Sequence, residues 1–274
     1  MKRILITGTD SYIGTHLRQH LASFPDAYAV TEVSTQPFDD AVDFHGADAI
    51  VHVAAIVHRK ETKETLALYD AVNCDLAVRI AEKAKREGVK QFVLFSTMSV
   101  YGMDAGVITR DTVPQPKTAY GRSKLAAERR IAALADDGFT VTVLRPPMVF
   151  GPGAKGNPAR LERLSKRLPF CPDFENRRSM VSIDTLCERI RSYLDAPRSG
   201  VVFPQEASPI ATKTLIAEAM RAQGRRVRYT KLLNPAIRVL KNCSRAGKKA
   251  FGDLVYEGLN DAVLPLETGE EKHP

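Results

Sequence analysis

The sequence ILITGTDSYIG, residues 4–14, decides the fold of this chain, because an apolar strand runs into a glycine-containing turn and then into a helix. In a turn of this kind, backbone N–H groups and the helix N-terminus form a cradle for a pyrophosphate. A three-glycine pattern would place glycine at position 11, where this chain has Ser11. We expect the Ser11 side chain to restrict how closely the backbone approaches the phosphates.

Beyond this turn, apolar strand-like runs alternate with helical patterns through the N-terminal part of the chain. One helical pattern ends at Gly88 and another at Gly138, and each has an apolar stripe to bury. Such alternation predicts an α/β fold, a parallel sheet covered by helices. The predicted strands are Ile4–Thr7, Ala29–Val33, Ala49–Ala54, Gln91–Ser96 and Thr140–Leu144.

The pattern changes near Arg145, because prolines and glycines crowd the interval from Pro146 to Pro158. This composition predicts a hinge or a binding loop. We therefore predict a dinucleotide-binding domain formed by residues 1–146 plus about 180–205. Residues of about 147–179 and 206–274 are predicted to form a small C-terminal lobe.

Composition narrows the possible partners of the chain. The net charge of +8 over 274 residues fits an acidic ligand such as a nucleotide diphosphate, and fits nucleic acid or an anionic membrane surface equally well. Aromatic residues make up only 7% of the chain, Trp is absent, and no dedicated nucleic-acid recognition motif occurs. We therefore expect no nucleic-acid partner.

No apolar run approaches the ~20 residues that a membrane-spanning helix requires. The first strand begins almost at Met1, so we expect neither a secretory signal nor a transit peptide, and a cytoplasmic location. The four cysteines are scattered and the histidines form no cluster, so neither a disulfide framework nor a metal site is predicted.

Thr97, Tyr120 and Lys124 are the candidate catalytic residues. Tyr120 and Lys124 are four residues apart in a helical stretch and project from one face, so the ammonium can lie near the phenol. A nearby cation favours the ionised phenol and lowers a pKa that is ordinarily about 10. Thr97, at the end of a predicted strand, supplies a hydroxyl to the same reacting oxygen. Together they predict proton transfer.

Taken in order, these segments resemble the extended short-chain dehydrogenase/reductases, the NAD-dependent epimerase/dehydratase family of nucleotide-sugar enzymes. Residues 51–55 (VHVAA), 95–102 (FSTMSVYG) and 144–153 (LRPPMVFGPG) match family segments. The resemblance covers roughly residues 1 to 205. It implies a Rossmann-type doubly wound parallel sheet with a small C-terminal substrate-binding lobe. The cofactor, NAD or NADP, would contact Gly8, Ser11, Tyr12, Ile13, Gly14, Ala54, Ala55, Asn73, Tyr120, Lys124 and Pro147.

Within that group, residues 147–157 and 176–179 look most like reductases and epimerases of UDP-N-acetyl-hexosamines for bacterial surface polysaccharides. The resemblance places Ser99, Asn157 and Arg178 at the substrate. A guanidinium suits this role on physical grounds too, because its planar fork pairs with two phosphate oxygens and stays charged.

The resemblance implies a mechanism in which Tyr120 exchanges a proton with a sugar hydroxyl, Thr97 holds that oxygen and Lys124 binds the nicotinamide ribose. Dehydratases of the group carry an Asp-Glu pair after the catalytic Thr, whereas Met98-Ser99 follows here, so dehydration is disfavoured. Epimerisation and 4-keto reduction of a UDP-hexose or UDP-N-acetylhexosamine both remain. Two other functions also remain: reduction of a different carbonyl substrate, and non-catalytic dinucleotide sensing.

Three further features bear on partners. The acidic residue expected at the end of the second strand for the adenosine ribose is not plainly present, although Glu32 is near, so NAD and NADP both stay open. Asn234-Pro235 predicts the start of a last helix with a basic stripe, either a solvated face or a membrane-docking face. By resemblance, we expect a homodimer through the helices that carry Asn73 and Tyr120.

Overall fold

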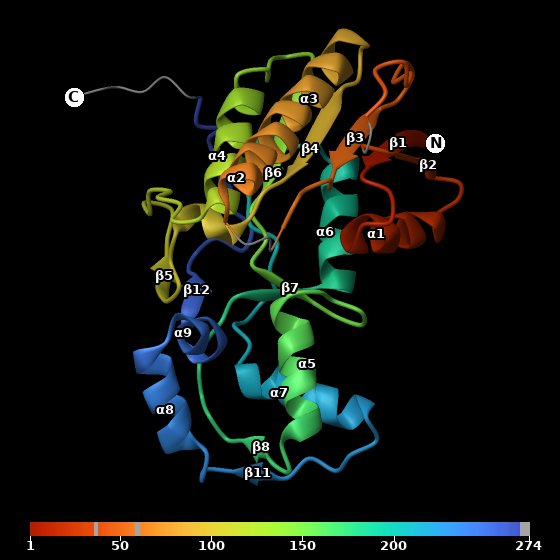
Figure 1. Cartoon of the computed structure of the whole chain (residues 1–274). Helices are drawn as coiled ribbons and strands as arrows, with labels where there is room; N and C mark the ends of the chain where they lie inside the picture. Colours follow the sequence, from red (N-terminus) through yellow and green to blue (C-terminus); the bar gives the residue numbers. More distant parts are fainter. Residues whose placement is uncertain (36–37, 58–60, 269–274) are drawn as a thin grey trace, which may run out of the picture.

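The computed structural model describes residues 1–35, 38–57 and 61–268, and shows a sheet flanked by helices with a smaller lobe at one end (Figure 1). Within these residues the main sheet has seven strands in the order β13-β10-β6-β4-β3-β1-β2, all parallel to their neighbours except β13. The strands are β1 (Lys2–Thr7), β2 (Tyr28–Val33), β3 (Ala49–His52), β4 (Gln91–Phe95), β6 (Thr140–Leu144), β10 (Gly200–Val202) and β13 (Val263–Leu264).

The Rossmann-type fold predicted from the sequence is confirmed by this sheet. Each of the five predicted strands is present, although β3 ends at His52, two residues before the predicted end. The Val53 N–H still donates to the Thr7 carbonyl of β1 at 3.2 Å, and Ala54 then lies against Gly8 at the carboxyl edge of the sheet. Small residues at this position bring the backbone after β3 close to the turn after β1.

Helices cover both faces of the main sheet (Figure 1). On one face, α3 (Leu76–Arg86) and α4 (Ala119–Ala132) bury side chains such as Ile80 and Ile131 against β4 and β6. On the other face, α1 (Tyr12–Ala22) and α6 (Ile183–Asp195) bury Leu17 and Ile190. Before α3 the chain forms α2 (Lys63–Tyr69) and a wider helical turn, η1 (Asp70–Asp75). The sheet is therefore apolar on both sides, as a doubly wound fold requires.

The lobe has its own apolar core, which includes Leu161, Phe174, Ile216 and Ile237. Its helices are α5 (Asn157–Arg167), α7 (Thr212–Ala222), α8 (Asn234–Cys243) and α9 (Arg245–Phe251). Three short parallel pairs accompany them: β7 (Met148–Phe150) with β9 (Met180–Ser182), β8 (Cys171–Pro172) with β11 (Tyr229–Thr230), and β5 (Gly106–Ile108) with β12 (Leu254–Tyr256).

The C-terminal part differs from the sequence prediction in two ways. Val263–Leu264, which the sequence placed in the lobe, forms β13 and pairs antiparallel with β10 of the main sheet. The predicted last helix is two helices, because Ser244 is extended and its hydroxyl accepts a hydrogen bond from the Gly247 N–H at 2.9 Å, starting α9. The predicted basic stripe is thus divided between α8 and α9. The other domain limits stay a prediction. No helix among the described residues is long and apolar enough to span a membrane.

Candidate active site

The turn after β1 has the conformation that close phosphate approach needs. Gly8 has a φ of +106°, and a Cβ there would lie 3.0 Å from the Ala54 backbone. Ser11 is the N-cap of α1, and its hydroxyl accepts a hydrogen bond from the Gly14 N–H at 3.0 Å. The side chain therefore folds back onto its own helix and uses an N–H group that a phosphate would otherwise receive.

The proline- and glycine-rich loop lies against this turn, at the end of the strands where the predicted site should be. Gly151 has a φ of +144°, and a Cβ there would lie 3.0 Å from the Tyr12 hydroxyl. That hydroxyl is buried without a hydrogen-bond partner among the described residues, and burial raises its pKa. Ile13 follows, half-buried, in the first turn of α1. The loop and the turn thus form parts of one site.

Asn73 holds the chain after β3 against α4. Its side-chain oxygen accepts from the Ile56 N–H at 2.8 Å, and its amide nitrogen donates to the Ile56 carbonyl and the Ser123 hydroxyl, both at 3.1 Å. Because these bonds engage both ends of the amide, Asn73 positions Ala55 and α4 rather than presenting a free group to a cofactor.

Thr97 and Tyr120 meet although 23 residues separate them in the chain. Thr97 follows β4 and begins a short helical turn (Met98–Tyr101), while Tyr120 lies in the first turn of α4, which the Thr118 hydroxyl caps by accepting from the Gly121 N–H at 3.1 Å. The Thr97 hydroxyl lies near the Tyr120 phenol and favours its ionised form. Ser99 follows on the same short turn, exposed, and its N–H donates to Thr97 at 3.1 Å.

The predicted low pKa of the Tyr120 phenol is wrong for this structure. Burial raises the pKa to about 12, and the nearby Thr97 hydroxyl only partly opposes this effect. Lys124 is also desolvated, with 1% of its surface exposed, and burial lowers its pKa to about 8. Desolvation disfavours both charged forms, and it outweighs the attraction on which the sequence argument relied.

Lys124 is the most informative polar group of this site. Its amine is buried and has no hydrogen-bond partner among the described residues. A buried, unpartnered amine costs stability, so proteins retain such groups mainly where a ligand completes the hydrogen bonding. Together with the Gly8 cradle and the free Tyr12 hydroxyl, it shows that the residues present fit a bound dinucleotide.

A buried ionic network that the sequence did not predict supports α4, the helix that carries Tyr120 and Lys124. Arg145 donates to both carboxylate oxygens of Glu128, with the shortest contact at 2.6 Å, and to the Tyr101 hydroxyl at 2.9 Å. The Ser96 hydroxyl also donates to Glu128. The sequence feature that could have indicated this network is Glu128, which lies one helical turn after Lys124 in the predicted helix. The network fixes α4 against the end of β4, where Thr97 lies.

Arg177 and Arg178 are neighbours in the chain but lie in different surroundings. The Arg178 side chain is buried and donates to the Gly252 carbonyl at 2.7 Å, which leaves its Nε without a partner among the described residues. Desolvation lowers the pKa of Arg178. Arg177 is exposed. Asn157, the other lobe residue predicted to contact substrate, lies half-buried in the first turn of α5.

Pro147 and Glu32 complete the predicted set. Pro147 is buried directly before β7, and the Met98 N–H donates to the neighbouring Pro146 carbonyl at 3.0 Å, which joins this loop to the segment of Thr97. Glu32 precedes the last residue of β2 and pairs with Arg18 of α1 at 3.1 Å, and its second carboxylate oxygen is buried without a partner among the described residues. An acidic and a basic group thus lie together near the predicted ribose position, and NAD and NADP both remain candidates.

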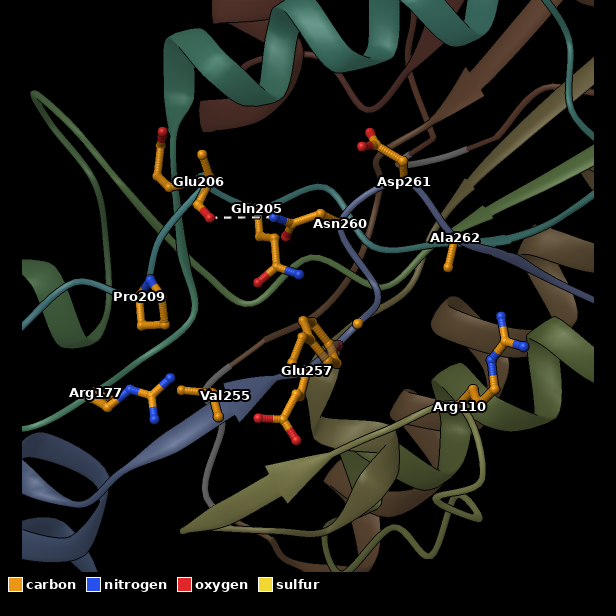
Figure 2. Close-up of a pocket in the computed structure, with 13 residues that line it drawn as sticks. Arg110, Arg177, Gln205, Glu206, Pro209, Val255, Glu257, Asn260, Asp261 and Ala262 are labelled. Atoms are coloured by element: carbon orange, nitrogen blue, oxygen red, sulfur yellow. Dashed lines mark hydrogen bonds between the residues drawn. The ribbon is translucent and has the colours of Figure 1, made fainter.

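A cavity of about 490 Å³ lies away from these catalytic side chains, between β12 and the segment after β10 (Figure 2). Arg177 and Arg110 lie on opposite sides of it, and Glu206 and Glu257 contribute carboxylates. Neither Thr97, Tyr120 nor Lys124 lines it. We therefore place the candidate active site by its chemistry, at the carboxyl edge of the parallel strands, where ligands of open α/β sheets bind.

Known proteins resemble the chain both in sequence and in fold. A UDP-glucose 4-epimerase from Vibrio cholerae is 32% identical over 245 residues, which cover 79% of this chain and 74% of that protein. An N-acetyl-alpha-D-glucosaminyl-diphospho-ditrans,octacis-undecaprenol 4-epimerase from Escherichia coli O157:H7 is 26% identical, over 56% of this chain and 51% of that protein.

Two solved structures share the fold over 98% of this chain and 94% of their own. MoeE5 in complex with UDP-glucose and NAD superimposes with a TM-score of 0.70 at 21% identity. UDP-glucuronic acid 4-epimerase from Bacillus cereus in complex with NAD superimposes with a TM-score of 0.71 at 18% identity. The model of the NAD dependent epimerase/dehydratase family matches residues 4–202. Because that match spans most of the chain, including the Gly8 turn and α4, the chain belongs to the NAD dependent epimerase/dehydratase family, a family of oxidoreductases and epimerases.

Proposed function

We propose that this protein is an NAD(P)-dependent epimerase or 4-keto reductase that acts at C4 of a UDP-hexose or UDP-N-acetylhexosamine. The proposal rests on the closeness of the Thr97 hydroxyl to the Tyr120 phenol, with the buried, unpartnered amine of Lys124 one helical turn away. A phenol, a hydroxyl and an amine in this order suit proton transfer at a carbon that also exchanges a hydride.

The residues have separate parts in such a reaction. When bound, the nicotinamide dinucleotide supplies the site for the hydride. Tyr120 takes the proton from the sugar hydroxyl, or returns it in reduction, and Thr97 holds that oxygen by a hydrogen bond. Lys124 would donate a hydrogen bond to the ribose of a bound nicotinamide dinucleotide. The Gly8 turn and the N-terminus of α1 hold the pyrophosphate.

The residues after Thr97 argue against dehydration. Met98 and Ser99 follow it, and neither side chain carries a carboxyl group that could eliminate water. The reaction would therefore end at oxidation, reduction or inversion of the carbon. The Vibrio cholerae and Escherichia coli relatives, both named as 4-epimerases, support the choice of C4 and of a sugar diphosphate.

We also propose a role in surface polysaccharide synthesis and a homodimer formed by the helices of Asn73 and Tyr120. The Escherichia coli relative, whose name describes a lipid-linked sugar diphosphate, supports the first. Light scattering tests the second: twice the chain mass is expected, and a monomer at micromolar concentration would exclude the dimer.

A substrate panel tests the proposed reaction. The purified protein is incubated with UDP- and dTDP-hexoses and their 4-keto forms, with NADH and with NADPH, and products are separated by chromatography. Inversion at C4 without net consumption of dinucleotide indicates an epimerase, and stoichiometric consumption with a 4-keto sugar indicates a reductase. Turnover of a non-sugar carbonyl alone, or no turnover with any member, would contradict the proposal.

Replacing Ser11 by Gly tests how the dinucleotide turn works. We expect the dissociation constant for NAD(P) to fall several-fold, because the Gly14 N–H would lose its bond to the Ser11 hydroxyl and become available to a phosphate. The free energy of unfolding should fall by only a few tenths of a kcal/mol, since glycine is itself an acceptable N-cap. Titration calorimetry measures the first quantity. Weaker binding by the variant would show that Ser11 itself contributes to the phosphate site.

Replacing Arg178 by Leu tests the predicted diphosphate contact. A lost charge-assisted hydrogen bond to phosphate should raise KM for the nucleotide sugar by about 10- to 100-fold, with a smaller change in kcat. Arg178→Lys should recover part of that loss. Arg177→Leu, at the exposed neighbour, is the matched control and should leave KM within about twofold. Equal effects at the two positions would remove Arg178 from the substrate site.

A further inference from the structure

Basic residues are segregated at the C-terminal end of the chain. Residues 219–252 contain ten Lys or Arg and no Asp or Glu, so the rest of the chain has a net charge of −2. Some of these ten are neutralised by distant acids, as in the pair of Arg245 with Asp104. Arg226, Arg228, Lys231 and Arg238 are exposed and make no ion pair within the described part of the chain.

Large apolar side chains are exposed among these charges. Leu232 is 88% exposed and Val239 is 62% exposed, and Phe170, Tyr229 and Leu240 are exposed as well. Burying Ile237 in the lobe core leaves Val239, two residues further along α8, on the outer side of the helix. Scattered exposed apolar residues are normal, but four within residues 229–240, together with Phe170, are typical of an interaction surface.

These residues belong to one end of the lobe. Phe170 directly precedes β8, and β8 pairs with β11, which carries Tyr229. The Asn234 side chain donates to the Asp173 carbonyl at 2.9 Å and so joins the residue after β8 to the start of α8. Figure 1 shows β8, β11 and α8 in the part of the molecule farthest from the main sheet.

A hollow of about 570 Å³ at this end is lined by Lys231, Arg238 and Lys241 together with Asp173 and Glu175. Lys213 pairs with both acids and neutralises much of their charge. The exposed cations around the hollow therefore keep an excess of positive charge, which suits a phosphate headgroup.

We propose that this lobe tip, defined by Phe170, residues 226–232 and α8, docks on the surface of an anionic phospholipid bilayer. Exposed apolar side chains beside unpaired cations are the features of a protein surface that lies in the membrane interface. Nucleic acid is a poorer fit, because a phosphate backbone would use the cations and leave Leu232 and Val239 in water. The proposal does not depend on the reaction proposed above.

The chain contains no Trp, so Leu232→Trp places a single reporter at the tip. The full-length variant is mixed with vesicles of phosphatidylcholine alone or of phosphatidylcholine and phosphatidylglycerol, in 0.1 M salt. We expect cosedimentation and a blue shift of the Trp emission with the anionic vesicles only. No cosedimentation, or equal binding to both vesicle types, would overturn the proposal.

Charge removal then locates the surface. Arg228→Gln, Lys231→Gln and Arg238→Gln together should weaken binding to the anionic vesicles on the order of 100-fold, from the contribution of each cation near such a surface. The control removes three exposed cations of the main domain, as Arg86→Gln, Lys90→Gln and Arg198→Gln, and should change binding less than fivefold. Equal weakening by the two sets would overturn the assignment.

The exposed apolar side chains of the lobe tip are tested separately. Leu232→Ser with Val239→Ser should weaken vesicle binding at least tenfold without changing the catalytic rate on a soluble substrate. Binding to a DNA duplex as tight as to vesicles, with no Trp blue shift, would show a polyanion site instead. Concentration-dependent self-association of the purified protein that is lost in the Ser variant would show that a second copy covers the surface. Either result would overturn the proposal that this surface docks on a bilayer.

Discussion

A Tyr120→Phe variant is expected to lose about 10³-fold or more in kcat while its fold and its dinucleotide affinity are retained. The change removes one oxygen, the one that exchanges a proton with the sugar, and keeps the ring that packs 6.4 Å from the ring of Tyr69. Steady-state kinetics on the substrate identified by the panel measures the loss. Thermal unfolding and NADH titration establish that the variant is otherwise intact.

Tyr69→Phe is the matched control for that variant, because it removes a phenol oxygen from the adjoining buried ring. Its kcat should remain within a few-fold of the parent protein. The pH–rate profile adds a second readout. The part of the profile at alkaline pH, where the rate changes with ionisation of the Tyr120 phenol, should be absent from the residual activity of Tyr120→Phe. Full activity of Tyr120→Phe would remove this residue from the mechanism.

Lys124→Met is expected to abolish turnover and to stabilise the dinucleotide-free protein. Burial lowers the pKa of Lys124 from 10.5 to about 8, so the folded state disfavours the ammonium at neutral pH. A shift of that size corresponds to about 3 kcal/mol at pH 7, which a methionine of similar shape would recover. Urea unfolding at pH 7 without dinucleotide measures this gain.

The stability difference between the parent protein and Lys124→Met should depend on pH. Between the folded pKa of about 8 and the unfolded pKa of 10.5, the unfolded chain binds more protons than the folded protein at Lys124. The contribution of Lys124 to stability therefore rises with pH through this window. The advantage of Lys124→Met should shrink to about 1 kcal/mol at pH 9.5. A variant less stable than the parent at pH 7 would mean that Lys124 has a partner in solution.

Dinucleotide should reverse the order of stability. The parent protein gains stability from NAD(P) by mass action, whereas the Met variant, which lacks the amine that binds the ribose, should gain much less. Thermal unfolding with and without millimolar dinucleotide shows the difference. Equal gains in both proteins would indicate that Lys124 does not bind the cofactor.

The sequence predicted the elements whose local pattern determines them. The buried runs at Ile4–Thr7 and Gln91–Ser96, and the Gly8 turn between a strand and a helix, require no knowledge of distant contacts. The predictions that were wrong concern properties that depend on long-range structure. The pKa values of Tyr120 and Lys124 follow from desolvation by packed neighbours, and spacing along a helix does not measure desolvation.

The C-terminal errors have the same origin. The break at Ser244 depends on close packing of Gly247 against the Leu240 carbonyl, where a Cβ would lie 2.1 Å from the oxygen. The separation of Arg177 from Arg178 depends on which neighbour lies on each side of an extended segment. Neither of these contacts can be predicted from the local sequence pattern.

The ionic network of Arg145 has a consequence for how the chain can be divided. The Tyr256 hydroxyl of β12 donates to the Arg145 carbonyl at 2.9 Å, and its ring packs on Phe203 and Tyr101. Residues near the C-terminus thus complete the wall behind the catalytic helix. A chimera that exchanges the substrate lobe with that of a relative must therefore bring a compatible β12 with it, and the first 205 residues do not amount to a transferable catalytic module.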